Sequence, residues 1–266
     1  MLCPTELTLC SGPVEINGRT IEPDDTKAVI ECRLLFAFPA VNYYGFGVHP
    51  AVIGRSYRSL ELQKVDLLHL VKSYDPETIT HDRIIGTVAG VEFPREPAGG
   101  WRAVKEQSPC VRAILSIYKQ AQGVDRLLGQ HLGGRKEWTT SIEYSYQRKS
   151  GIFCVNGKPD AHTPQDLAEL GWKSIPFTEA PEELLATLPT RPYHRIKEWN
   201  GKAVAFLCGG VAGQISCEGI GLVENSAEEQ AVITRVLADG WHGTGAMVEQ
   251  FLAASKSILK LSQKKP

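Results

Sequence analysis

Short apolar runs separated by turn-forming residues dominate the first part of the chain and its middle. Each run is rich in Val, Ile, Leu or aromatic residues and is bounded by glycine, proline or polar residues, which is typical of β-strands. Five segments share this pattern: residues 28–35, 60–71, 83–93, 138–147 and 151–155. We expect the fourth and fifth to pair as a hairpin, and residues 45–50 to form a turn-rich loop.

The apolar spacing becomes helical between about Ser108 and Leu132. Val111, Ile114, Leu115 and Tyr118 recur at the i, i+3, i+4, i+7 positions of one helix face, and a Gly-Gly pair follows as a stop signal. Further helices are predicted at residues 163–170, 180–185, 226–237 and 245–261. Strands are predicted at residues 203–208 and 215–223, joined by a tight glycine-rich hairpin.

This order of elements predicts an α+β protein. Short strands interrupted by helices, without regular βαβ alternation, favour an antiparallel, barrel-like sheet over a doubly wound fold. We expect a barrel domain over residues 1–225 that contains a proline-rich excursion at 157–200, and a C-terminal helical segment over 226–266.

Composition restricts the partners that we expect. The chain has 266 residues and a formal net charge of −1, which gives no electrostatic reason to bind nucleic acid or an anionic membrane. No apolar run approaches the length of a membrane span, and no signal-peptide pattern begins the sequence. The seven cysteines are an odd number without a C-x-x-C pair. We therefore expect buried thiols in a reducing cytosol rather than a disulfide framework or a zinc ribbon.

The strand predicted at 138–147 holds the best candidate for a nucleophile. Ser141 lies among aromatic and β-branched residues, and a serine becomes nucleophilic when a histidine takes its proton. His69, at the end of a predicted strand, and His81, just before the next strand, are both candidate bases. Ser145 is the alternative nucleophile, because strand alternation puts it on the same face as Ser141.

Three segments in this order resemble the phage prohead maturation proteases. Residues 81–88 read His-Asp-Arg-Ile-Ile-Gly-Thr-Val, similar to the segment after the catalytic histidine of that family. Residues 141–144 read Ser-Ile-Glu-Tyr, similar to the nucleophile segment, which is typically Ser-Ile-Gly-Phe. Residues 218–228 resemble the family's late strand.

The resemblance implies an assemblin-like fold, in which helices surround an antiparallel β-barrel core, and a Ser-His centre completed by a third histidine or an acid. His162 is the candidate third member, with Asp160 and Asp166 as rivals. No metal or cofactor is implied. The implied substrates and partners are capsid and scaffold proteins and further copies of the chain, inside the procapsid in the host cytoplasm.

Glu143 stands where the family usually has glycine, and it keeps a second hypothesis open. The chain would then be a catalytically inactive, capsid-associated structural or assembly protein of the same fold. A third hypothesis is a non-viral binding protein that has this order of strands by chance.

Overall fold

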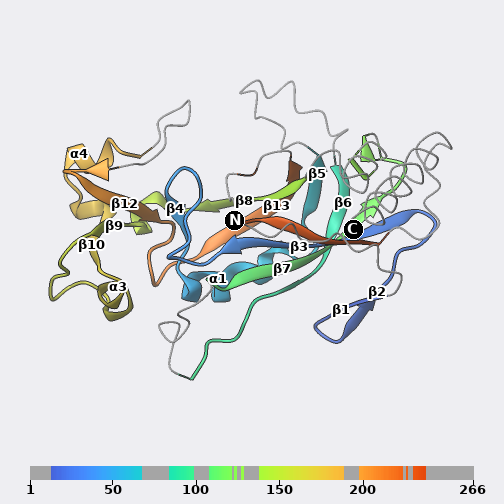
Figure 1. Ribbon diagram of the computed structural model, residues 1–266, viewed down its shortest axis with the longest axis horizontal. Coiled ribbons are helices and arrows are strands. Elements are labelled where there is room, and N and C mark those ends of the chain that lie inside the picture. Colours follow the sequence, from blue (N-terminus) through green and yellow to red (C-terminus); the bar gives the residue numbers. More distant parts are fainter. Residues whose placement is uncertain are drawn as a thin grey trace, which may run out of the picture.

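The described part of the computed structural model contains two β-sheets and a small hairpin (Figure 1). The structure describes residues 13–67, 84–98, 108–121, 123–124, 127–128, 138–188, 198–223, 226 and 230–237. The strands are β1 (Val14–Ile16), β2 (Arg19–Ile21), β3 (Lys27–Phe36), β4 (Phe46–Gly47), β5 (Lys64–Leu67), β6 (Ile84–Glu92), β7 (Cys110–Tyr118), β8 (Thr139–Tyr146), β9 (Ile152–Asn156), β10 (Trp172–Pro176), β11 (Glu198–Trp199), β12 (Lys202–Leu207), β13 (Ile215–Val223) and β14 (Val232–Leu237).

The larger sheet has seven strands in the order β14-β3-β7-β6-β5-β13-β8. Neighbouring strands are antiparallel except β5 and β13, which are parallel. The sheet curls into a half-barrel, so that its last strand returns towards β3. The buried Thr140 hydroxyl on β8 donates a hydrogen bond of 3.4 Å to the Arg33 carbonyl on β3. This curl holds β8 against the core on one face.

The smaller sheet has the order β10-β9-β12-β11, with β4 pairing in parallel with β12. Two of its strands, β10 and β11, belong to the proline-rich 157–200 excursion, and the sheet forms one end of the molecule (Figure 1). The α-helices of the described part are short: α1 (Pro50–Ser56), α3 (Gln165–Glu169) and α4 (Glu182–Leu185). Three 3₁₀ turns accompany them: η1 (Tyr57–Leu60), η5 (Arg148–Ser150) and η6 (Phe177–Glu179).

One apolar core connects the two sheets. It contains Val65 and Leu115 from the larger sheet and Phe153 and Phe206 from the smaller one, all fully buried. The Phe206 ring lies 6.0 Å from the ring of Tyr146 on β8 and 5.0 Å from the ring of Phe153, centroid to centroid. Such aromatic pairs add to the stabilisation from burial, so they join the sheets at this point.

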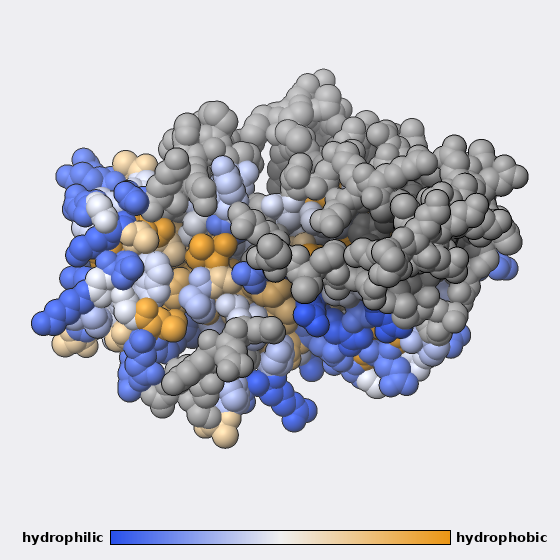
Figure 2. All heavy atoms as spheres, in the orientation of Figure 1, coloured by the Kyte–Doolittle hydropathy of each residue, from blue (hydrophilic) through white to orange (hydrophobic). Residues whose placement is uncertain are grey.

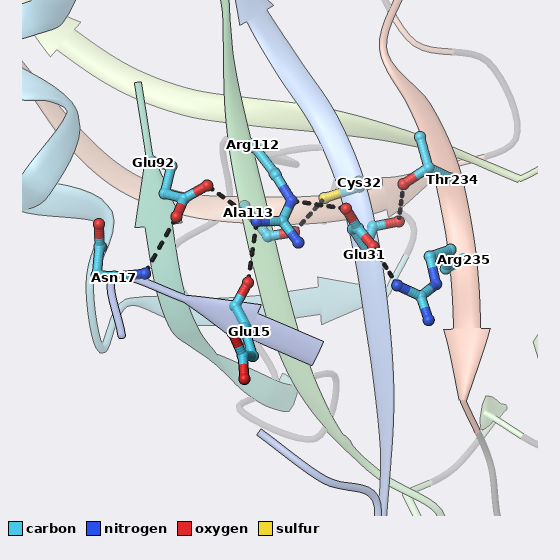
Figure 3. Close-up of polar contacts among 9 residues, drawn as sticks. All are labelled: Glu15, Asn17, Glu31, Cys32, Glu92, Arg112, Ala113, Thr234 and Arg235. Atoms are coloured by element: carbon cyan, nitrogen blue, oxygen red, sulfur yellow. Dashed lines mark hydrogen bonds and ion pairs between the residues drawn. The ribbon is translucent and has the colours of Figure 1, made fainter. Parts of the chain in front are cut away.

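An ion-pair network fastens the outer face of the larger sheet near the β1–β2 hairpin (Figure 3). The Arg112 guanidinium on β7 donates to Glu31 on β3 at 2.6 Å and to Glu92 on β6 at 2.9 Å. It also donates to the Glu15 carbonyl of the hairpin at 3.1 Å, while Arg235 on β14 lies 3.5 Å from Glu31. Charged groups of four strands and the hairpin are therefore joined through two arginines.

The prediction of a sheet-based fold is confirmed, and the prediction that helices surround it is wrong. The protein is mostly β, with a curled half-barrel sheet, and the described part holds only a few short helices rather than a surrounding layer. The strands predicted at 28–35, 83–93, 138–147, 203–208 and 215–223 are present as β3, β6, β8, β12 and β13. The helices predicted at 163–170 and 180–185 are present as the short α3 and α4.

The helix predicted over 108–132 is wrong at Cys110–Tyr118, which forms β7. Val111, Ala113, Leu115 and Ile117 alternate into the main core, as a strand requires. Ile114 faces the other way and is buried beneath the β1–β2 hairpin with Val14 and Ile16. Because both faces of the strand are covered, its apolar residues imitate helical spacing.

Three further expectations differ from the structure. Residues 232–237 form β14, which pairs with β3, instead of part of a helix. Strand β9 pairs with β10 and β12, and β8 pairs with β13, so β8 and β9 are not a hairpin. The glycine-rich turn after β12 passes the chain from the smaller sheet to the larger one and is likewise not a hairpin. The helix predicted at 245–261 lies outside the described residues.

Candidate functional site

Ser141, on the edge strand β8, lies at one end of a row of paired residues that crosses part of the larger sheet. It pairs with Gly221 on β13, Gly221 pairs with Asp66 on β5, and Asp66 pairs with Ile84 on β6. Residues that pair directly across strands direct their side chains to the same face of a sheet. Ser141 and Asp66 therefore share a face, about 10 Å apart at two strand spacings, and Gly221 places no side chain between them.

A charged cluster occupies the neighbouring row on the same face. Lys64 pairs with Gly219, which pairs with Glu143, two residues after Ser141. The Lys64 ammonium is hydrogen-bonded to Asp66 and lies 3.1 Å from the Glu143 carboxylate. A side chain at position 219 would come within 3.1 Å of the Lys64 Cγ atom. Glycine there lets the lysine stem cross β13 between the two carboxylates.

Lys64 is unsuited to act as a base at this site. Burial opposes the charge of its ammonium group, but hydrogen bonds and attraction from Asp66 and Glu143 outweigh burial and raise the pKa of the amine. The amine therefore stays protonated at neutral pH and does not accept the proton of Ser141.

Asp66 is the most buried charged group of this cluster. Its side chain is 2% exposed, and one carboxylate oxygen accepts from Lys64. The other oxygen, Oδ1, is buried and has no hydrogen-bond partner among the described residues. An unsatisfied buried carboxylate oxygen is costly. The sequence pattern gave no reason to select Asp66, because an isolated Asp inside a strand has no motif.

The two candidate bases, His69 and His81, lie outside the described residues. The chain leaves β5 after Leu67 and enters β6 at Ile84, so both histidines belong to the connection between these strands. Since Asp66 pairs with Ile84, that connection starts and ends next to the row that contains Ser141. Chain connectivity thus brings both ends of the histidine-bearing segment to this part of the sheet.

His162 lies elsewhere, in the turn before α3 beside the smaller sheet. It is exposed, and its backbone N–H donates to Asp160 at 3.1 Å. Asp160 in turn forms an ion pair with Lys173 at 3.0 Å. No described contact connects His162 with Ser141, and β8 belongs to the other sheet.

A second histidine–carboxylate pair, His49 with Asp166, was not expected from the sequence. The His49 Nε2 atom is hydrogen-bonded to Asp166 of α3, while Nδ1 accepts a 3.2 Å hydrogen bond from the Ala51 N–H at the start of α1. This partner lowers the pKa of the Asp166 carboxyl. With both ring nitrogens engaged, the imidazole caps α1 and is hydrogen-bonded to Asp166, and it has no nitrogen free for a nucleophile.

The surroundings of Ser141 are partly open. The residue is half-buried, and a cavity of about 50 Å³ beside β8 is lined by Ser141, Ile142 and Tyr144 together with residues 35–36, 42 and 46–48. Ser145, four residues later, is exposed. Of the two serines, Ser141 has the more enclosed position.

Four of the described cysteines are inert thiols. Cys32, Cys154, Cys208 and Cys217 are buried and unpaired, and burial raises the pKa of each. Within the described ranges, no group of His, Cys, Asp and Glu has the arrangement of a metal site. None of the described helices is long and apolar enough to cross a bilayer.

Comparisons with known proteins give no relative from which a role for this site could be inferred. No family model, no curated protein and no solved structure matches the chain.

Proposed function

We propose that the chain is a serine endopeptidase of the prohead maturation type, which cleaves capsid and scaffold proteins during virus head assembly. The observation that carries the proposal is the row Ser141–Gly221–Asp66, which sets a hydroxyl and a buried carboxylate on one face of the sheet. The curled sheet is compatible with an assemblin-like barrel.

In this mechanism Ser141 attacks the scissile carbonyl, and an imidazole takes its proton and returns it to the leaving amine. His69 and His81 are the candidate bases. Because Lys64 stays protonated, the base has to be one of the other groups. No metal or cofactor takes part in the proposed reaction.

Asp66 takes the place of the third member in this proposal. Its Oδ1 atom is buried and lacks a donor among the described residues, and an imidazole N–H is the donor that a catalytic centre would supply. The alternatives have other partners: Asp160 is paired with Lys173 and Asp166 with His49, while His162 is exposed near the smaller sheet.

The test is coexpression with the cognate capsid and scaffold proteins, with intact mass as the readout. We expect the wild type to shorten a partner and Ser141→Ala to leave it whole. Ser145→Ala is the matched control, since it removes the same hydroxyl from the same strand and face, and it should cleave as the wild type does. Asp66→Asn should lower the cleavage rate at least about 100-fold, because it removes the carboxylate that orients the imidazole.

Cleavage that survives in Ser141→Ala would contradict the proposal. If the wild type leaves every partner whole yet assembles with the capsid protein, the inactive, capsid-associated assembly protein becomes the better function. The ion pair between Glu143 and Lys64 favours that alternative, because it fixes a carboxylate two residues from the serine.

A further inference from the structure

A second cavity lies on the smaller sheet, away from Ser141. Its volume is about 270 Å³, and its lining consists of Val155, Asn156, Gly157, Lys158, Lys173, Ile175, Trp199, Asn200 and Lys202. Strands β9, β10, β11 and β12 all contribute. On the side shown in Figure 2, this end of the molecule is mostly hydrophilic.

Strand register places the basic and aromatic residues of the cavity on one face. Lys173 pairs with Val155, which pairs with Val204, and Trp199 pairs with Lys202 two residues before Val204. Alternation then directs the side chains of Lys173, Lys202 and Trp199 to the same side. Gly157 leaves space for the end of the Lys202 side chain, since a Cβ at position 157 would lie 3.3 Å from the Lys202 Nζ atom.

The charges of the cavity are unbalanced. Among the described residues, its lining has three lysines and no carboxylate. Lys173 is neutralised by Asp160 at 3.0 Å, whereas neither Lys158 nor Lys202 forms an ion pair with a described carboxylate. Two ammonium groups therefore remain beside the apolar wall that Trp199, Ile175 and Val155 form.

We propose that this cavity binds an acidic peptide segment of a partner protein. A carboxylate would lie between Lys158 and Lys202, an adjacent apolar side chain would lie against Trp199, and the Asn200 amide would hydrogen-bond the peptide backbone. Nucleic acid is disfavoured because the described lining has no arginine fork for phosphate and the whole chain has a net charge of −1. The site is independent of the proposed serine chemistry.

The experiment measures fluorescence anisotropy of a short, fluorescein-labelled peptide of alternating glutamate and leucine added to the full chain. The same peptide with glutamine in place of glutamate, and an oligothymidylate of equal length, are the comparison probes. We expect the glutamate peptide to bind more tightly than either, with an affinity that falls as salt is added.

The variant Lys158→Gln/Lys202→Gln should weaken binding of the glutamate peptide about tenfold or more, since it removes both uncompensated charges. The matched control, Arg19→Gln/Lys149→Gln, removes two exposed charges outside the cavity and should leave the affinity unchanged. Ser141→Ala should also bind as the wild type does, which separates this site from the peptidase proposal.

Three results would overturn the inference. One is the absence of binding by the wild type, and another is an equal loss of affinity in the cavity and control variants. The third is tighter binding of the oligothymidylate than of the glutamate peptide through the same two lysines.

Discussion

Gly219 leaves the space that the charged cluster beside Ser141 needs. Gly219 lies beneath the Lys64 stem, and an added Cβ would be 3.1 Å from Lys64 Cγ and 3.2 Å from the Lys64 carbonyl oxygen. The carbonyl is part of β5 and cannot move freely. We expect Gly219→Ala to lower the free energy of unfolding by about 1–2 kcal/mol through overpacking, as measured by urea denaturation.

Gly54→Ala is the matched control for that substitution. Gly54 is exposed in α1, and the nearest atom to its added Cβ is 3.9 Å away, on the Phe93 ring. Alanine favours a helix over glycine by roughly 0.5–1 kcal/mol, so this variant should be neutral or more stable. Equal destabilisation by both substitutions would show that the close approach to Lys64 is unimportant.

The hydrogen bond between His49 and Asp166 predicts a dependence of stability on acid pH. The hydrogen bond from His49 lowers the pKa of Asp166 below its ordinary value of 3.8. The unfolded chain thus binds this proton before the folded protein does. The contribution to stability is present above pH 3.8 and is lost as the pH falls through the lower, folded pKa.

We therefore expect Asp166→Asn to be less stable than the wild type at about pH 5, and the difference to shrink by about pH 3. Urea denaturation at both values measures this. Asp25→Asn, at an exposed aspartate, should follow the wild type at each pH. If the difference in stability between the wild type and Asp166→Asn stays constant with pH, the hydrogen bond from His49 is not what makes Asp166 stabilising.

At the scale of elements, Arg112 connects three strands and a hairpin (Figure 3). Its partner Glu31 is only 13% exposed, so removing the arginine leaves a mostly buried carboxylate with one remaining cation, Arg235. We expect Arg112→Met to cost about 1–3 kcal/mol of unfolding free energy. Adding Glu31→Gln should recover part of that loss, because the buried charge disappears.

Arg33→Met is the control for the Arg112 network. Arg33 lies opposite Arg112 on β3, is exposed and forms no ion pair with a described residue. Its loss should change stability by no more than about 0.5 kcal/mol. If Arg33→Met and Arg112→Met are equally destabilising in thermal unfolding, the network has no special role.

How far the sequence predicts an element depends on how many of its faces are covered. Strand β3 was predicted from its apolar run, and β8 from its β-branched and aromatic residues. Strand β7 was not, because Ile114 is buried by a hairpin from the far N-terminal part of the chain. Pairing between distant strands is also hidden from the sequence. Ser141 could be selected from its own strand, whereas Asp66 became a candidate only when pairing through Gly221 put it on the same row.

At the scale of the whole molecule, the aromatic contacts of Phe206 connect the two sheets. Its ring lies near those of Phe46, Tyr146, Phe153 and Phe177, with centroids 5.0–6.2 Å apart. Tyr146 belongs to the larger sheet, and the other three lie on or beside the smaller one. Because all five pack in one core, the sheets should unfold together rather than as separate units.

This cooperativity predicts the effect of Phe206→Leu on amide hydrogen exchange. The smaller side chain leaves a cavity in the shared core, which we expect to cost about 1–3 kcal/mol. Exchange should accelerate by the same factor for slow amides in β9 and β12 and for those in β3 and β7, since all would exchange through one global opening. Acceleration confined to β9 and β12 would instead show that the smaller sheet opens without the larger one. The cavity that we propose to bind a peptide would then lie on a unit that unfolds separately.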